Sequence, residues 1–542
     1  MKVCWDSIIS VLTFDKSIWD GAVRTSEPIY SIAHFPLTMK YEKGKRNGRT
    51  KVSFLHLDLG IGGAERLVVD AATQCQELGY QVQIYTTHHD ITHCFPETLE
   101  KDKRASFVHV FGDWLPRYID VGMLTGSGSG SGREEWDSNS NSNRRFIALC
   151  GITRMLYLAT VFIFNHIFTL HDEAAECDSH IVFLDGLSVP IPLLAIFGFP
   201  VLFYCHFPDR YLSPINLEKR EISGIAPWCK RCYRDVVDIL EDISMAQAVI
   251  VAVNSEFTAS VCRESFSFLR NKEQESKLVT IYPAVSCSTT DINSDRDEHG
   301  DVSLLGYCND YDHVFVSLNR YERKKKLELA INAFKIFIEN YNQKETLGRM
   351  LLVVSGGYDE VVEENVSYYK ELAALVQSLN LNDVIVFRRS ISNEERIALM
   401  KRATALLYTP DREHFGIVPI EAMSLGTAVI AVASGGPLET IKDGVTGFLV
   451  KQEPHEFASA MYKIASKDNK CSEYMGKAGK ERVKALFSTD ALGAKLESTI
   501  NQIIKTQGKP GYIFLTAWIV VLIMFGQVIG YTFIRIGKVL GY

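Results

Sequence analysis

The stretch that decides the fold of this 542-residue chain is EHFGIVPIE, residues 413–421. Its two carboxylates, Glu413 and Glu421, are eight positions apart. We expect the first on a loop that enters a helix and the second two turns into that helix. Gly416 removes a side chain where backbone must approach a ligand, and Pro419 is tolerated in a first turn whose amides are free. The pair therefore suits a nucleotide-sugar, because sugar and ribose hydroxyls can meet the carboxylates while the helix N-terminus faces a diphosphate.

The flanking residues matter because a solvated helix also carries glutamates at this spacing. After Glu421 the sequence continues AMSLGTAVIAVASGGPLETIKDGVTGFLV, in which a buried strand over residues 428–433 runs into Gly435 and Gly436. Glycines in this place permit tight backbone near a phosphate. The region resembles the C-terminal domain of the retaining GT-B glycosyltransferases of the family-4 type, which carries a Glu-x7-Glu motif.

The composition fits two or three α/β domains, since 46% of the residues are hydrophobic and 23% are charged. The net charge of -7 argues against nucleic acid as a partner, because binding a phosphate backbone needs a clustered basic excess. Apart from one CxxC, the twelve cysteines have no paired spacing, which indicates a reduced, cytosol-facing protein and not a disulfide scaffold.

Two groups of cysteines and histidines could suggest a metal, and we interpret neither as a metal site. Cys229 and Cys232 form a single CxxC with no second pair nearby. A second group lies in a loop after a strand and consists of His88, His89, His93 and Cys94. Such histidines are more typical of a surface or of a ligand-lining loop. The sequence therefore predicts no metal and no other cofactor.

The N-terminal half has the pattern of a Rossmann-like domain over residues 51–283. It starts with a βαβ unit, in which a strand at 51–57 is followed by a turn that contains Gly60, Gly62 and Gly63. A helix at 64–78 and a second strand at 82–86 complete the unit. The sixth position of a dinucleotide-binding glycine motif is Glu65 here, which disfavours an oxidoreductase. Buried strands follow at 181–184 and 201–204, and the second runs into the loop HFPD, which begins at His206.

Three segments of this half do not follow the regular pattern. Residues 1–50 have no long periodicity, and we expect a poorly ordered extension. Residues 126–144 are rich in Gly, Ser and Asn and cannot bury enough surface to order themselves, so they are predicted to form a disordered loop. Residues 146–170 are apolar nearly all round, which a buried core helix and a helix resting on a membrane explain equally well.

The second half repeats the alternation of strands and helices and predicts a second doubly wound domain over residues 284–480, with the hinge near Pro283. Its strands are expected at 314–318, 351–355 and 384–387, with a helix at 326–340. A closing helix over 481–505 should follow. Residues 512–534 are predicted to be a transmembrane or membrane-embedded segment, since they are apolar and long enough to cross ~30 Å of hydrocarbon.

Basic residues after a strand are the candidates for holding a leaving group. A nucleoside diphosphate carries roughly two to three negative charges, which an enzyme without a metal must meet with fixed cations and helix termini. Arg320 and Lys325 lie in SLNRYERKKKLEL, directly after an apolar strand, and Lys324 and Lys326 share the run. His206 leaves a strand end, where a neutral imidazole could bind the donor sugar or stabilise charge during transfer.

Six segments carry a more specific pattern: FLHLDLGIGGAERLVVDAA, FYCHFPD, SLNRYERKKKLELAINAF, LVVSGGYDE, EENVSYYKEL and LLYTPDREHFGIVPIEAM. Together they resemble the dolichol-linked oligosaccharide α-1,3/1,6-mannosyltransferases of N-glycan assembly. The resemblance implies a GT-B fold, in which two doubly wound Rossmann-like domains face a cleft. It also implies GDP-mannose as donor and, as acceptor, a dolichyl-diphosphate chitobiose with one or two mannoses.

The resemblance further implies roles for the candidate residues. In retaining GT-B enzymes an arginine and a lysine five residues on contact the diphosphate, and Arg320 and Lys325 match this spacing. Glu413 would position the sugar, and Glu421 would bind the ribose. Gly62 and Gly63 would let the backbone approach the diphosphate and the acceptor.

The implied location is the endoplasmic reticulum membrane, with the catalytic domains on its cytosolic face. Other lipid-linked oligosaccharide mannosyltransferases are candidate partners there. Three alternatives stay open: a transferase of the same architecture with a UDP-sugar donor, a sugar epimerase, and a non-catalytic membrane scaffold that binds sugars.

Overall fold

The computed structural model describes residues 49–99, 108–120, 144–145, 147–173, 177–212, 225–270, 272–285, 305–341, 348–466 and 471–506. The expected extension before Arg49, nearly all of the Gly/Ser/Asn loop and the apolar segment 512–534 lie outside these residues. Arg49 and Thr50 already belong to the first strand, and Arg144 belongs to a short strand, so both expected boundaries are shifted by one or two residues.

The N-terminal domain is built on a seven-stranded sheet in which every neighbouring pair is parallel. In spatial order the strands are β3 (Val108–Val110), β2 (Gln81–His88), β1 (Arg49–Asp58), β6 (Cys177–Asp185), β7 (Val201–Cys205), β8 (Ile250–Val253) and β9 (Leu278–Thr280). Runs of buried apolar residues form the central strands, as is usual for a parallel sheet covered on both faces. The predicted strands of this half are therefore confirmed.

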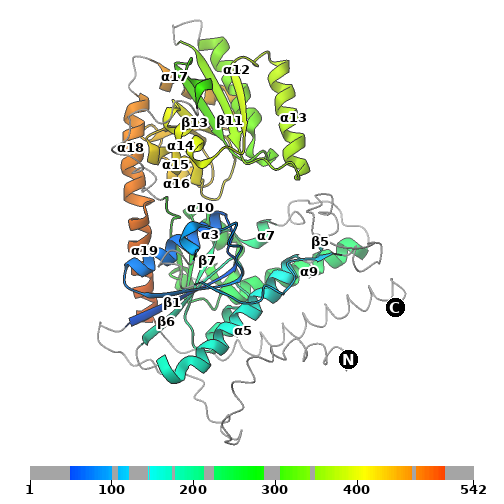
Figure 1. Ribbon diagram of the computed structural model, residues 1–542, viewed down its shortest axis with the longest axis vertical. Helices are drawn as coiled ribbons and strands as arrows, with labels where there is room; N and C mark the ends of the chain where they lie inside the picture. The colour runs from blue at the N-terminus through cyan, green and yellow to red at the C-terminus, as the bar shows by residue number, and fades with distance from the viewer. Residues whose placement is uncertain are drawn as a thin grey trace, which may run out of the picture. The chain divides into compact units, whose positions relative to one another are not determined.

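Helices cover both faces of this sheet (Figure 1). They are α3 (Gly63–Glu77), α5 (Ile147–Glu173), α6 (Ile191–Ile196), α7 (Asp209–Leu212), α9 (Ile225–Met245), α10 (Glu256–Ser265) and α11 (Lys272–Glu275). Single 3-10 turns lie at η2 (Pro96–Thr98) and η4 (Ser267–Arg270), and a small antiparallel pair joins β4 (Ile119–Asp120) to β5 (Arg144–Arg145).

The C-terminal domain is a second parallel sheet, with six strands. Their spatial order is β12 (Ile385–Arg389), β11 (Met350–Gly356), β10 (His313–Leu318), β13 (Ala405–Tyr408), β14 (Ala428–Val432) and β15 (Gly447–Val450). Its helices are η6 (Gly306–Cys308), η7 (Arg323–Lys325), α12 (Leu327–Tyr341), α13 (Glu363–Ser378), α14 (Asn393–Arg402), α15 (Ile417–Leu425), α16 (Pro437–Thr440), α17 (Pro454–Ala465) and α18 (Cys471–Leu486). The expectation of two doubly wound domains is confirmed.

The end of the described chain differs from the single closing helix expected over 481–505. Helix α18 ends at Leu486, and a separate helix, α19 (Thr489–Thr506), follows it. Ser488 starts the second helix, because its hydroxyl accepts a hydrogen bond from the backbone N–H of Ala491. The backbone carbonyl of Phe487, a fully buried residue, accepts a hydrogen bond from Val285 N at 2.8 Å. The break thus ties the chain to the segment just after the predicted hinge.

Helix α19 packs on the N-terminal domain and not on the domain that precedes it in sequence. Its buried residues join the core that also contains strand β1 and helix α3, and they are Leu492, Leu496, Ile500 and Ile503. Figure 1 shows α19, near the red end of the colour scale, beside α3, near the blue end. Residues far apart in sequence therefore complete one core.

Helix α5 covers one face of the N-terminal sheet. Within the described part of the chain, its segment Leu149–His166 is the one helix that is long and apolar enough to cross a membrane, and half of this segment is buried in the protein. Met155, Leu158 and Phe162 lie in the core beneath the sheet, whereas Phe164 is 40% exposed. The core interpretation holds for the buried face, and a membrane contact of the other face stays a prediction.

Candidate active site

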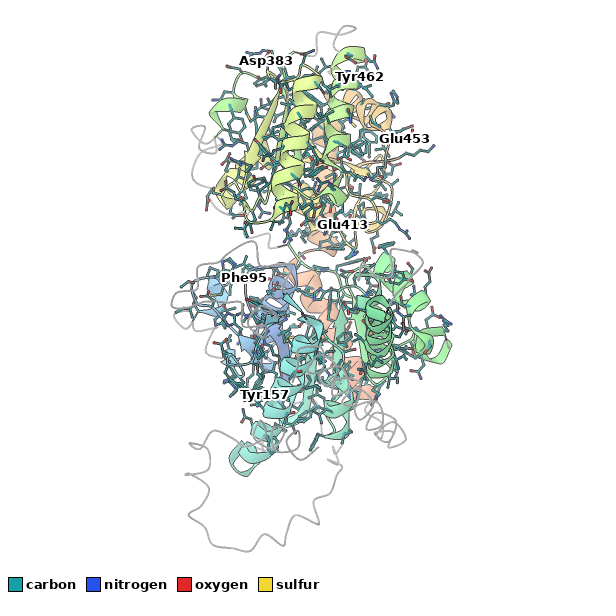
Figure 2. The ribbon with its side chains drawn as sticks, turned by 90° about the vertical axis from the view of Figure 1, so that its right-hand side faces the viewer. Phe95, Tyr157, Asp383, Glu413, Glu453 and Tyr462 are labelled. Atoms are coloured by element: carbon teal, nitrogen blue, oxygen red, sulfur yellow. The ribbon has the colours of Figure 1, made fainter. Side chains whose placement is uncertain are left out.

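The loop between β13 and α15 carries the first of the two glutamates. Figure 2 shows Glu413 at one end of the C-terminal domain, with Asp383, which precedes strand β12, at the other. Gly416 caps helix α15 with φ +85, a left-handed conformation that side chains disfavour. Because the helix begins only at Ile417, Glu421 lies just past its first turn and not two turns in, as we expected. The two glutamates are still carried by one loop and the helix that follows it.

Lys325 and Glu413 are brought together by the fold. Lys325 ends the 3-10 turn after β10, and its Nζ lies 2.5 Å from Glu413 Oε2. The backbone carbonyl of Lys325 accepts a hydrogen bond of 2.6 Å from Thr409 Oγ1, in the same loop as Glu413. Neither charged side chain is more than a quarter exposed. The contact fixes the register of the basic run, because Lys325, and not its neighbour Lys324, faces the glutamate.

The other two charged candidates have different surroundings. Arg320 follows β10, is 73% exposed, and has Glu322 as a distant ion-pair partner at 3.8 Å. Its guanidinium is thus held weakly, which leaves it able to reorient toward a ligand. Glu421 Oε2 accepts a hydrogen bond of 2.7 Å from Arg396 on helix α14. This arginine orients the carboxylate that we expect to bind ribose.

Gly435 and Gly436 have a structural explanation. A Cβ atom on Gly435 would lie 2.4 Å from the carbonyl oxygen of Glu413, and one on Gly436 would lie 2.4 Å from that of Phe415. The backbone N–H of Gly436 donates to the Glu413 carbonyl at 2.7 Å. The two glycines therefore let the chain pack against the loop that carries Glu413, whereas the sequence had suggested close approach to a phosphate.

His206 lies at the carboxyl end of β7, as predicted, and its ring is held by an aspartate. His206 Nε2 is 3.1 Å from Asp185 Oδ2, and Asp185 ends the neighbouring strand β6. The next residue, Phe207, stacks on the ring of His414 with 3.7 Å between ring centroids and 8° between planes. Burial lowers the pKa of His414, which favours the uncharged ring in this stack. Residues adjacent to His206 and to Glu413 are thus in direct contact.

Gly62 and Gly63 begin helix α3, and the fold does not require either to be glycine. Gly62 is extended, with φ -167, and a Cβ there would meet only the flexible side chain of Glu65. A Cβ on Gly63 would have no atom of the described residues within 4 Å. The space beside Gly63 is therefore free of described protein atoms, and a ligand can approach the helix N-terminus from that side.

The candidate metal ligands have other partners. His88 Nδ1 lies 2.6 Å from Asp113, and His89 Nε2 lies 2.9 Å from Thr98 Oγ1. Within the described ranges no group of three or more His, Cys, Asp and Glu side chains is arranged to hold a metal. Cys229 and Cys232 lie on helix α9, and their side chains are not among those that the structure describes.

Several residues of this region were not identified from the sequence. Asp185 had a signal, since it is a charged residue directly after a buried apolar run and before a glycine. His56 lies inside strand β1 and contacts Asp185 across the sheet. Arg396 and His414 had no signal of their own, because their partners are defined by contacts between elements and not by spacing.

Comparisons with known proteins agree with this geometry. The model of the family described as Glycosyl transferases group 1 matches residues 308–482, which include every candidate of the C-terminal domain. Alpha-1,3/1,6-mannosyltransferase ALG2 of Mus musculus is 37% identical over 466 residues, which cover 86% of this chain and 99% of that protein. The protein of the same name from Saccharomyces cerevisiae is 35% identical over 499 residues, which cover 86% of this chain and 87% of that one.

Solved structures agree on the architecture. Sucrose-phosphate synthase from Thermosynechococcus elongatus superposes with a TM-score of 0.56 at 18% identity, and covers 84% of this chain and 100% of its own. Alr3699/HepE of Anabaena, in complex with UDP, superposes with a TM-score of 0.55 at 17% identity, with 83% and 100% covered. At such identities the likeness concerns the fold alone, and it confirms the GT-B arrangement of two Rossmann-like domains.

Proposed function

The chain belongs to the family of alpha-1,3/1,6-mannosyltransferases, and on that premise we propose that it transfers mannose from GDP-mannose to dolichyl-diphosphate chitobiose bearing one or two mannoses. One observation of the structure carries the proposal: a fixed cation, Lys325, lies against the loop carboxylate Glu413. A glycosyl donor needs both, a positive group at its diphosphate and a carboxylate at its sugar. The products are α-1,3 and α-1,6 linkages formed with retention.

In the proposed reaction the bond between mannose C1 and the β-phosphate oxygen breaks, and its electron pair leaves with GDP. The acceptor hydroxyl forms the new C1–O bond on the same face, and its proton passes to the departing phosphate oxygen. Negative charge grows on the phosphate during this step, so cations placed beforehand stabilise the transition state more than the ground state. Arg320 and Lys325 are the residues to which we assign that role.

The ion pair between Lys325 and Glu413 gives the donor site a resting state. Without donor, each side chain neutralises the other at 2.5 Å. When a diphosphate competes for Lys325, Glu413 becomes available to the mannose hydroxyls and to the positive charge that develops at C1. Glu421, held by Arg396, binds the ribose, and Gly62 with Gly63 admits the diphosphate and the acceptor to the N-terminal side of the site.

The proposed location is the endoplasmic reticulum membrane, with both Rossmann-like domains in the cytosol. A polyprenyl acceptor does not leave the bilayer readily, so an enzyme that uses it gains from attachment to the same membrane. Residues 512–534 are the proposed anchor. Other mannosyltransferases that act on the same lipid are proposed as partners.

The test is incubation of the purified protein with GDP-mannose and synthetic lipid-diphosphate acceptors, followed by linkage analysis. We expect two mannoses to be added in succession to the acceptor that bears one, and one mannose to the acceptor that bears two. UDP-sugars should not compete with GDP-mannose. Transfer from a UDP-sugar instead would indicate another lipid glycosyltransferase of the same fold. Turnover of donor without any acceptor would indicate an epimerase, and sugar binding without transfer in any mixture would indicate a scaffold.

A further inference from the structure

Asp185 joins two histidines from neighbouring strands. Its side chain is fully buried at the end of β6, which lies between β1 and β7 in the sheet. Oδ1 lies 2.7 Å from His56 Nδ1 on β1, and Oδ2 lies 3.1 Å from His206 Nε2 just after β7. The order of strands therefore places one carboxylate oxygen against each ring.

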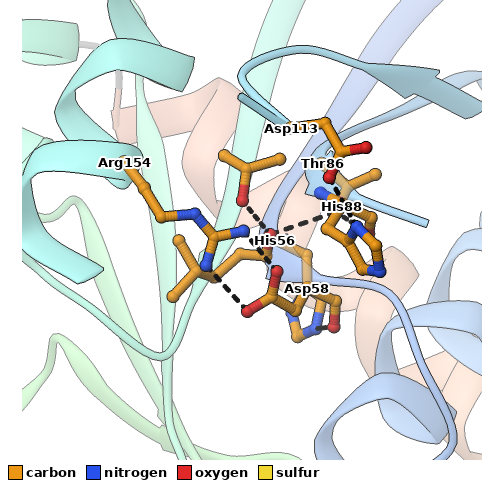
Figure 3. A network of polar contacts seen from close by, with 8 residues as sticks. His56, Asp58, Thr86, His88, Asp113 and Arg154 are labelled. Carbon is orange, nitrogen blue, oxygen red and sulfur yellow. Dashed lines mark hydrogen bonds and ion pairs between the residues drawn. The ribbon is translucent and has the colours of Figure 1, made fainter. Parts of the chain in front are cut away.

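His56 has acceptors at both ring nitrogens. Nδ1 faces Asp185, and Nε2 lies 2.9 Å from the backbone carbonyl of Asp58. Figure 3 shows His56 and Asp58 together with Arg154, whose guanidinium pairs with the Asp58 carboxylate at the end of β1. Two acceptors at fixed positions favour the doubly protonated ring.

The charges around this group agree with that geometry. Burial opposes the positive charge of His56, but Asp185 outweighs it and, with Glu65 from α3, raises the pKa of His56 to about 9. Burial likewise opposes the charge of Asp185, yet the two histidines hold the pKa of this carboxyl well below its usual range. The buried pair of His56 and Asp185 is thus an internally neutral ion pair at neutral pH.

The neutrality of this pair determines what His206 can do. The ring of His206 meets Asp185 through Nε2, so that nitrogen carries a proton, and Nδ1 is the acceptor of the neutral ring. The ring centroids of Tyr204 and His206 are 5.0 Å apart, and His414 of the C-terminal domain lies nearby. The side chain of His206 is 29% exposed. An unbalanced carboxylate at Asp185 would instead favour imidazolium, which has no acceptor.

We propose that His56 is a positioning residue for transfer: through Asp185 it keeps His206 as the neutral Nε2–H imidazole, whose Nδ1 accepts a hydrogen bond from a hydroxyl of the sugar substrate. The inference rests on the proposed function, which it extends to a residue without substrate contact. In this arrangement the positive charge of His56, a buried residue of β1, determines the protonation state of His206 in the site.

The first test is the pH profile of kcat/KM for His56→Asn. Asparagine keeps an N–H toward Asp185 but removes the positive charge. We expect kcat/KM at neutral pH to fall about tenfold or more, and the acidic limb of the profile to move to higher pH by about two units or more. His455→Asn, the same change at an exposed histidine of helix α17, should leave the profile in place. Equal profiles for His56→Asn and the unmodified enzyme would overturn the proposal.

The second test does not depend on activity. In ¹⁵N spectra of histidine-labelled full-length protein, His206 is assigned from the signal that His206→Asn removes, and His56 from the signal that His56→Asn removes. We expect His206 as the neutral Nε2–H tautomer at pH 7.5 and as imidazolium in His56→Asn. A neutral Nδ1–H tautomer, or no change in the variant, would overturn the proposal.

The two tests separate this inference from the proposed function. If the enzyme transfers no mannose but the spectra behave as expected, the positioning role stands and the proposed function fails. If the enzyme transfers mannose but the His206 signal is the same in His56→Asn, the proposed function stands and the positioning role fails. If His56→Asn does not fold, spectra of the unmodified protein still test the proposal. The signal of His56 is then assigned by elimination, and we expect His56 to stay doubly protonated up to about pH 9. A neutral His56 at pH 7 would overturn the proposal.

Discussion

At the scale of single residues, the contact between Lys325 and Glu413 separates otherwise similar lysines. Lys324 is 73% exposed and pairs with Glu322, outside the contact with Glu413. We therefore expect Lys325→Ala to lower kcat by about 100-fold or more, since it removes a cation from the departing phosphate. Lys324→Ala should change kcat by only a few-fold. Steady-state kinetics of both variants, with folding checked by circular dichroism, provide the measurement. Equal losses would place the wrong lysine at the diphosphate.

The buried ion pair of His56 with Asp185 predicts a pH-dependent stability. The pKa of His56 is about 9 in the folded state and 6.5 as an ordinary value. Because folding raises the pKa of His56, the contribution of His56 to the free energy of unfolding is complete below pH 6.5. It is lost as the pH rises through 9. Over this window the contribution is about 3 kcal/mol.

Denaturant unfolding of His206→Asn and of the double variant His56→Asn/His206→Asn at pH 6 and pH 9.5 provides the measurement, because His206 would otherwise take up a proton in place of His56 and mask the difference. The free energies of unfolding should differ by about 3 kcal/mol more at pH 6 than at pH 9.5. A difference that is the same at both values would mean that His56 is neutral in the folded protein. The comparison with His455→Asn controls for the change of residue type.

At the scale of secondary structure elements, two glycines at helix N-termini should respond in opposite ways to alanine. Gly416 has φ +85, so Gly416→Ala should destabilise the protein by about 1–2 kcal/mol. A Cβ on Gly63 would lie more than 4 Å from every other side chain that the structure describes, so Gly63→Ala should leave the stability unchanged and raise KM. Thermal unfolding and kinetics distinguish the two cases. Unchanged kinetics in Gly63→Ala would show that no ligand approaches this turn.

The strands could be predicted because their signal is local. The run 428–432 is apolar without interruption, and the run 314–318 is interrupted only by Ser317; the structure places strands β14 and β10 there. The division between α18 and α19 could not be predicted in the same way. Ser488 is a local N-cap signal, but the hydrogen bond that the Phe487 carbonyl accepts at the break comes from Val285, about 200 positions earlier.

The candidate site shows the same limit. Glu413, Glu421, Arg320 and Lys325 were found because their spacing follows a known pattern. The contact of Lys325 with Glu413 joins residues 88 positions apart, and that of His56 with Asp185 joins residues 129 positions apart. Such pairs depend on which strands are neighbours in the sheet, and spacing along the chain does not contain that information.

At the scale of the whole molecule, the proposed use of protein cations predicts activity without a divalent metal. Transfer in the presence of excess EDTA should stay within a few-fold of the untreated enzyme, because Arg320 and Lys325 meet the diphosphate charge. A matched reaction with added manganese provides the control. Complete loss in EDTA, restored by manganese or magnesium, would contradict this prediction.

A second prediction at this scale concerns the membrane. Deletion of all residues after Lys509 removes the apolar segment but leaves α19, which ends at Thr506. The truncated protein should bind GDP-mannose with unchanged affinity in calorimetry, while its attachment to membranes weakens. Material that still pellets in high salt would identify α5 as a second contact, because apolar insertion is not screened. Attachment unchanged from the full chain would show that residues 512–534 are not the main anchor.

The packing of α19 against α3 also has a consequence for biosynthesis. The N-terminal domain is the first to leave the ribosome, yet its core lacks Leu492, Leu496, Ile500 and Ile503 until nearly the whole chain has been translated. Its apolar groove beside α3 therefore stays uncovered while the entire C-terminal domain emerges. During that interval a nascent chain exposes a surface that chaperones of the holdase type bind. Folding of the first domain is completed by the last helix of the described chain, so the two domains cannot mature in the order in which they are synthesised.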